Sequence, residues 1–110
     1  MKQFFIFLSL LITINLYSNT NEAIVIDVRS IAEWNQGHLS KAQRVDWDTI
    51  SNEITKLAPD KNNKIILYCR SGNRAGKAMK TLAKMGYSDL TNAGSVESAK
   101  NLLNDTVVTN

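Results

Sequence analysis

Two short, largely apolar runs constrain the fold of this chain more than any other feature. The segments AIVIDV (23–28) and KIILYC (64–69) are rich in β-branched residues, which favour strands. Continuous apolar runs of this length are typical of strands that are buried on both faces of a parallel sheet. We therefore expect both runs to be strands of such a sheet, with 64–69 near its centre.

Helical patterns separate the expected strands. We expect two further brief strands at 42–46 and 89–94. The segments with helical spacing of apolar residues are 30–37, 48–58, 74–87 and 95–104. Strands that alternate with helices through short connections predict an α/β domain in which helices flank a small, largely parallel sheet.

Residues at the helix ends support these boundaries. Ser30 and Glu33 have the spacing of a capping box, in which each side chain bonds the backbone of the other residue. Asp48 is the expected N-cap of the second helix. Gly86 is the expected residue just beyond the end of the third helix, where a left-handed backbone favours glycine.

The N-terminus differs from the rest of the chain. Lys2 precedes an uncharged apolar run of 13 residues at 4–16, followed by a polar stretch. A membrane-spanning helix needs roughly 20 apolar residues. We therefore expect residues 1–18 to be a cleaved signal peptide, residues 19–110 to be a single domain, and the mature protein to lie in the periplasm, not on a membrane. An uncleaved membrane anchor is the alternative.

Charge and cysteine usage limit the possible partners. The net charge of the 110-residue chain is +3 and is spread along the sequence, so a nucleic-acid partner is not expected. A single cysteine cannot form a disulfide within the chain. In an exported protein, an unpaired thiol is a reactive group or pairs with another molecule.

The single cysteine lies at the expected carboxyl end of the strand 64–69, where parallel α/β sheets bind their ligands. The loop after it precedes the N-terminus of a helix, and its backbone N–H groups can surround an anion. Such surroundings also stabilise a thiolate. Cys69 is therefore the candidate nucleophile. The candidate substrate-binding residues are Arg70, Ser71, Gly72, Asn73 and Arg74; Gly72 would allow a positive φ, and the two arginines would add positive charge.

Other interpretations of these residues remain open. A lone cysteine at a strand end is commonly an inert core residue. His38 could be a catalytic base, although a structural hydrogen-bonding role is favoured, and Asp27 with Arg29 is favoured as an ion pair that anchors a loop. One histidine and one cysteine do not supply the ligands of a zinc site, so no metal is expected.

Three segments together resemble rhodanese domains. The first is IDVRSIAEWNQGHL (26–39), which has the Asp-x-Arg, acidic-aromatic and Gly-His pattern of that family. The second is YCRSGNRA (68–75), which is similar to the family's active-site loop. The third is MGYSDLTNAGS (85–95), with Gly-Tyr and Asn-x-Gly. The sequence departs from the family pattern outside the loop, at Ser40 and Lys41, at Asp46 and Trp47, and at Ser95.

The resemblance implies a thiosulfate sulfurtransferase with a rhodanese-like fold. Cys69 would take a sulfane sulfur from a small donor such as thiosulfate as a persulfide, and pass it to cyanide or a thiol. The loop residues 70–74 would bind the donor. The family needs no cofactor or metal for this reaction, and a monomer is expected.

Several alternatives to sulfur transfer are compatible with the sequence. A cysteine phosphatase or arsenate reductase would carry one residue more between its cysteine and arginine than the four between Cys69 and Arg74. The shorter loop suits one added sulfur atom better than a tetrahedral oxyanion. A thiol redox protein, a sulfur carrier and a binding module of rhodanese fold also remain open.

Overall fold

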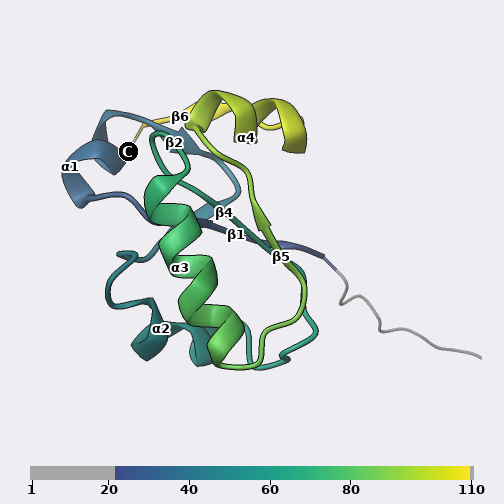
Figure 1. Ribbon diagram of the computed structural model, residues 1–110. Helices are drawn as coiled ribbons and strands as arrows, with labels where there is room; N and C mark the ends of the chain where they lie inside the picture. Colours follow the sequence, from purple (N-terminus) through teal and green to yellow (C-terminus); the bar gives the residue numbers. More distant parts are fainter. Residues whose placement is uncertain (1–21, 110) are drawn as a thin grey trace, which may run out of the picture.

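Four parallel strands form the central sheet of the computed structural model, which describes residues 22–109 (Figure 1). The strand order is β3-β1-β4-β5. A separate antiparallel pair joins β2 to β6. The elements in chain order are β1 Ile24–Asp27, α1 Ile31–Gln36, β2 His38–Leu39, β3 Ala42–Arg44, α2 Ile50–Leu57, β4 Ile65–Tyr68, α3 Asn73–Lys84, β5 Leu90–Asn92, α4 Val96–Leu103 and β6 Val107–Val108.

The α/β class and the parallel sheet are confirmed. The run expected near the centre of the sheet is β4, which lies between β1 and β5. Every residue of β4 is buried, as expected for a strand covered on both faces. The predicted signal peptide, residues 1–18, and the predicted start of the mature chain at residue 19 lie outside the described residues.

Helices cover the two faces of the sheet and form two cores. Side chains of Ile26 and Leu67 point to the face that packs against α2 and α3, where they contact a cluster that includes Ile54 and Leu82. The neighbouring strand positions point to the face covered by α4, as the alternation of strand side chains requires. That second core includes Val25, Leu39, Ile66, Tyr68, Ala93 and Ala99.

The register of the sheet brings several carboxyl ends of strands to one edge. Asp27 of β1 lies opposite Tyr68 of β4, and Leu67 lies opposite Asn92 of β5. Residues that directly follow these positions must therefore lie near one another. This edge carries Cys69, which is the residue after Tyr68.

Two of the three predicted helix ends are confirmed. Ser30 and Glu33 form the capping box of α1. Gly86 has φ +100° just beyond the end of α3. The assignment of Asp48 as an N-cap is wrong, because α2 begins at Ile50 and its N-cap is Thr49, which makes no side-chain capping bond. Residues 46–49 instead form a turn, in which the Thr49 N–H donates to the carbonyl oxygen of Asp46 at 3.2 Å.

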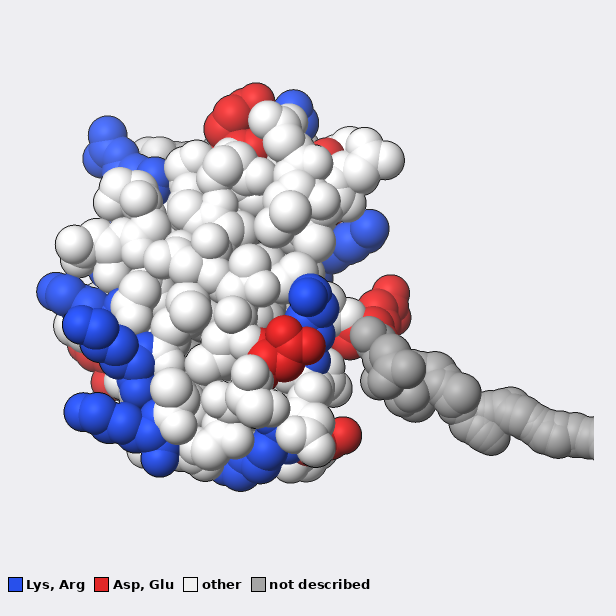
Figure 2. Space-filling model, turned by 45° about the vertical axis from the view of Figure 1, so that its right-hand side comes forward, with Lys and Arg blue, Asp and Glu red and all other residues white. Residues whose placement is uncertain are grey.

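Charged side chains are unevenly placed on the face shown in Figure 2. The middle of this face is largely uncharged, and Lys and Arg side chains gather at its margins.

Within residues 22–109, no helix has both the length and the apolar character needed to cross a membrane.

Candidate active site

Cys69 lies directly after β4 and is fully buried. Its backbone N–H donates to the carbonyl oxygen of Gly94 at 2.9 Å, which ties the end of β4 to the loop after β5. Its side chain packs within the core between the sheet and α2 and α3. The backbone bond and the packing therefore fix the thiol in position at the edge of the core.

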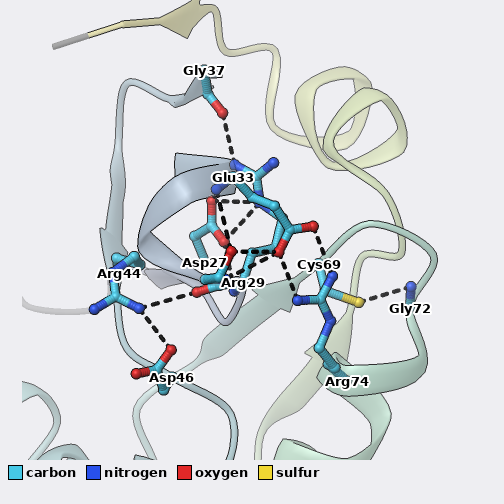
Figure 3. A network of polar contacts seen from close by, with 10 residues as sticks. Asp27, Arg29, Glu33, Gly37, Arg44, Asp46, Cys69, Gly72 and Arg74 are labelled. Atoms are coloured by element: carbon cyan, nitrogen blue, oxygen red, sulfur yellow. Dashed lines mark hydrogen bonds and ion pairs between the residues drawn. The ribbon is translucent and has the colours of Figure 1, made fainter. Parts of the chain in front are cut away.

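Backbone N–H groups of the following loop surround the sulfur atom. The Gly72 N–H donates to Sγ at 3.0 Å (Figure 3). Burial raises the pKa of the Cys69 thiol, but hydrogen bonds from the backbone N–H groups of the loop and the first turn of α3 outweigh this effect. The net result is a pKa below the ordinary value, so the thiolate is favoured. These N–H groups belong to Ala75, Ser71, Gly72 and Arg74.

The backbone conformation of Gly72 explains why glycine stands in this loop. Its φ of +95° lies in the left-handed region that side chains disfavour. A Cβ atom at this position would make only ordinary contacts, 3.4 Å from Cα of Gly94 and 3.5 Å from Oδ1 of Asn92. The positive φ predicted for Gly72 is therefore confirmed, and this φ, rather than a lack of space, favours glycine.

Arg74 does not present an unpaired charge to the sulfur. Its guanidinium donates from Nη1 to Oε1 of Glu33 at 2.7 Å and from Nη2 to Oε2 at 3.0 Å. The sequence predicts a positive charge here but does not indicate this partner. A bidentate carboxylate neutralises much of that charge, so backbone N–H groups, rather than the Arg74 side chain, account for the stabilised thiolate.

The remaining loop residues lie at the surface around the thiol. The side chains of Arg70, Ser71 and Asn73 are exposed. Among residues 22–109, Arg70 takes part in none of the ion pairs within 4.0 Å. Arg70 is thus the arginine of this loop whose charge is available to an approaching anion.

Asp27 and Arg29 form the ion pair predicted from the sequence. Arg29 Nη2 lies 2.7 Å from Oδ2 of Asp27 and donates to the carbonyl oxygen of Gly37, also at 2.7 Å. The Arg29 backbone N–H donates to Oδ1 of Asp27 at 2.9 Å. The pair is buried and anchors the segment after β1 to the end of α1, as expected for a structural role.

His38 is a buried residue of β2. Its ring stacks on Trp34, with ring centroids 3.4 Å apart, and its Nδ1 lies 3.0 Å from the carbonyl oxygen of Leu39. These contacts fit the structural role favoured from the sequence. Within the described part of the chain, no three His, Cys, Asp or Glu residues are grouped so that they could hold a metal ion.

The sequence does not indicate a functional role for two residues near the site. Its patterns predict Glu33 as a capping residue of α1 and as part of the acidic-aromatic pattern, but Glu33 also binds Arg74, 41 positions away. Asn92 is expected only as part of the Asn-x-Gly pattern. Its side chain donates to the carbonyl oxygen of Gly72 at 2.9 Å and so contacts the loop around Cys69. The signal in the sequence that could indicate a role for them is that both lie in segments that resemble rhodanese domains.

The structure has a four-stranded parallel sheet and, directly after its strand β4, a thiol whose pKa is lowered. Comparisons with known proteins show the family to which this chain belongs. Residues 14–104 match the family model of the Rhodanese-like domain. The chain therefore belongs to the rhodanese-like domain family, whose members include sulfurtransferases. The match begins within the predicted signal peptide, so the domain boundary at residue 19 stays a prediction.

The share of a relative's length that matches this chain differs between relatives. Thiosulfate sulfurtransferase PspE of Escherichia coli (strain K12) is 33% identical over 72 residues, which are 66% of this chain and 69% of that protein. The tRNA uridine(34) hydroxylase of Leptospira interrogans is 35% identical over 80 residues, but this is 22% of its length. A solved structure described as rhodanese with anions from E. coli matches with a TM-score of 0.73 and 28% identity, and covers 81% of this chain and all of that one.

Proposed function

We propose that this protein is a thiosulfate sulfurtransferase that carries sulfur as a persulfide on Cys69. The observation that carries the proposal is the hydrogen bond from the Gly72 N–H to Sγ of Cys69, within a loop whose N–H groups favour the thiolate. A stabilised thiolate is a nucleophile, whereas an inert core thiol has no such donors. The similarity to PspE, whose name gives the same activity, supports the choice of thiosulfate.

The first half-reaction forms the persulfide. The thiolate of Cys69 attacks the outer sulfur of thiosulfate, a new S–S bond forms, and the original S–S bond breaks. The electron pair of that bond leaves with sulfite, which needs no proton. The N–H groups of the loop then stabilise the negative charge on the outer sulfur of the persulfide, as donors in an oxyanion hole do.

The second half-reaction returns the enzyme to its starting state. A nucleophilic acceptor, either cyanide or a thiolate, attacks the outer sulfur of the Cys69 persulfide. The S–S bond breaks, its electron pair returns to Cys69, and thiocyanate or a new persulfide leaves. The cycle is ping-pong covalent catalysis that requires neither a metal nor a cofactor.

A phosphatase mechanism fits the site less well. It would require a protonated group to supply a proton to an alcohol leaving group near neutral pH. The carboxyl group of Glu33 is close to the loop, but its hydrogen bonds to Arg74 lower its pKa to about 2. It is thus ionised and cannot supply that proton. Sulfite needs none, so the same carboxylate does not prevent sulfur transfer.

The cellular setting of the proposal rests on the sequence. A signal peptide at 1–18 would export the mature domain to the periplasm, where thiols and protein cysteines are available acceptors. We propose that the mature domain acts there as a monomer on a small sulfane-sulfur donor. Fractionation that finds the protein at full length in the cytoplasm would contradict the location without affecting the chemistry.

A turnover assay tests the chemistry. The mature protein is incubated with thiosulfate and cyanide, and thiocyanate is measured, with hydrolysis of an aryl phosphate as a parallel assay. We expect thiocyanate formation that Cys69→Ser abolishes, because a serine hydroxyl is not ionised near neutral pH and cannot form a persulfide. A phosphatase kcat/KM above that for thiosulfate, or thiocyanate formation by Cys69→Ser, would contradict the proposal.

A further inference from the structure

The ion pair between Glu33 and Arg74 joins α1 to the loop that holds the thiol. Both carboxylate oxygens of Glu33 accept hydrogen bonds from the guanidinium, at 2.7 and 3.0 Å. The two side chains are 27% and 28% exposed, so water screens the pair only in part. Such a bidentate pair fixes the orientation of both groups.

Glu33 is held in place independently of Arg74. Its Oε1 also accepts hydrogen bonds from the backbone N–H and the hydroxyl of Ser30, at 3.1 and 3.0 Å. The bonds to Arg74, with these bonds to Ser30, lower the pKa of Glu33 to about 2. A fixed negative charge therefore lies beside Arg74 at every pH at which the enzyme would work.

Arg74 is also part of the surroundings of the sulfur. Its backbone N–H is one of the donors that favour the Cys69 thiolate. The hydrogen bonds to Glu33 are the main cause of the raised pKa of Arg74, and the negative charge on Cys69 adds to it. Figure 3 shows the guanidinium bound to the Glu33 carboxylate. An anionic donor bound at Sγ would thus approach a guanidinium that already has a carboxylate partner.

We propose that Glu33 is a specificity-determining residue that weakens the binding of highly charged donors at Cys69. A doubly charged donor must compete with Glu33 for Arg74 and is repelled by its carboxylate, whereas a donor of lower charge loses less. The inference rests on the proposed function, because it concerns which sulfur donors the thiol accepts. Compared with a site in which both arginines lacked a carboxylate partner, this site therefore favours donors of low charge, such as organic thiosulfonates and persulfides.

Glu33→Gln is the variant that tests this role. Glutamine also completes a capping box at this position and can still accept one hydrogen bond from Arg74, so the fold should be kept. The matched control is Glu97→Gln, which removes the same charge from α4, where the Glu97 side chain is 75% exposed and pairs only at 3.9 Å with Lys100. Thermal unfolding of each variant confirms that the domain is folded.

The first measurement compares two donors that have the same reacting sulfur arrangement but different charge. Thiosulfate is a dianion and methanethiosulfonate is a monoanion. We expect Glu33→Gln to lower the KM for thiosulfate about fivefold and that for methanethiosulfonate about twofold, with kcat unchanged and with smaller effects at high salt. Glu97→Gln should leave both values unchanged.

The second measurement does not require sulfur transfer. Cys69 is alkylated with iodoacetate, which is anionic, and with iodoacetamide, which is neutral. The ratio of the two rates cancels any change in the thiolate fraction. Glu33→Gln should raise the iodoacetate-to-iodoacetamide ratio about twofold.

The outcomes separate this inference from the proposed function. If wild type turns over neither donor but Glu33→Gln shifts the alkylation ratio, the sulfurtransferase proposal fails while the charge effect of Glu33 stands. If Glu33→Gln leaves the alkylation ratio and the KM values unchanged, or slows both donors and both reagents equally, Glu33 has no specificity role. In that case its role is structural.

Discussion

The side-chain amide of Asn92 donates a hydrogen bond of 2.9 Å to the backbone carbonyl oxygen of Gly72. The other end of the same amide, Oδ1, accepts a hydrogen bond of 2.9 Å from the backbone N–H of Gly94. Gly94 in turn accepts from the N–H of Cys69. One side chain at the end of β5 therefore connects both backbone segments that fix the thiol and its loop.

Asn92→Ala should weaken the site without unfolding the domain, because this side chain lies at the surface and orients the loop rather than filling the core. Loss of its two hydrogen bonds should let the Gly72 N–H move relative to Sγ. We expect about a tenfold fall in kcat/KM and a rise in the pKa of Cys69, measured as the pH dependence of alkylation. Asn101→Ala, on the exposed surface of α4, is the control. An unchanged alkylation profile in Asn92→Ala would contradict the positioning role.

Two glycines of the same region should respond to alanine with opposite signs. Gly72→Ala forces a side chain into a left-handed backbone next to Gly94, so it should destabilise the fold by about 1–2 kcal/mol and reduce activity. Gly76 lies within α3, where a Cβ would make only an ordinary contact at 3.5 Å with Asn92. Gly76→Ala should therefore stabilise the fold by about 1 kcal/mol. Chemical denaturation measures both. Equal effects of the two substitutions would contradict this account of the loop.

The reactivity of Cys69 should depend on pH as a thiol of lowered pKa requires. The backbone N–H groups hold the pKa of Cys69 below its ordinary value despite burial. As pH rises, the alkylation rate should therefore reach its plateau at a lower pH than for a cysteine in a short peptide. Below the folded pKa, the rate should fall as the thiol becomes protonated. A profile that coincides with the peptide control would mean that the loop does not stabilise the thiolate.

The two arginines of the loop should differ in the step that they affect. Arg74→Ala leaves the Glu33 carboxylate unpaired beside the thiolate, so we expect kcat/KM to fall by about 10² to 10³. The fall should be smaller in a Glu33→Gln background, as a double-mutant cycle would show. Arg70→Ala should mainly raise the KM for thiosulfate and reduce its salt dependence, because its charge is exposed and attracts the donor. An equal fall in kcat/KM on Arg74→Ala in the wild-type and Glu33→Gln backgrounds would contradict the coupling of these two residues.

Local patterns in the sequence predicted the parts of the structure that local physics determines. The apolar run at 64–69 indicated a central strand, and Ser30 with Glu33 indicated a helix start. Cys69 follows that strand and precedes a glycine-bearing loop, and this placement is sufficient to predict backbone N–H groups around the sulfur. The Gly72 N–H is one of these groups.

Contacts between distant residues could not be predicted in the same way. The partner of Arg74 is Glu33, on another helix, and no spacing rule connects them. The pairing of β2 with β6 involves strands of two residues, too short to show a periodic pattern. Asp48 has the correct chemistry for an N-cap, but the turn before α2 moves the start of that helix beyond it.

Intact mass spectrometry of the purified mature protein before and after thiosulfate tests the central claim most directly. We expect wild type to gain the mass of one sulfur atom, to lose it again when cyanide is added, and to produce one equivalent of thiocyanate. Cys69→Ser should gain nothing under the same conditions. If wild type never acquires a cyanide-labile sulfur from thiosulfate or another sulfane donor, or if Cys69→Ser acquires one, Cys69 does not carry the transferred sulfur.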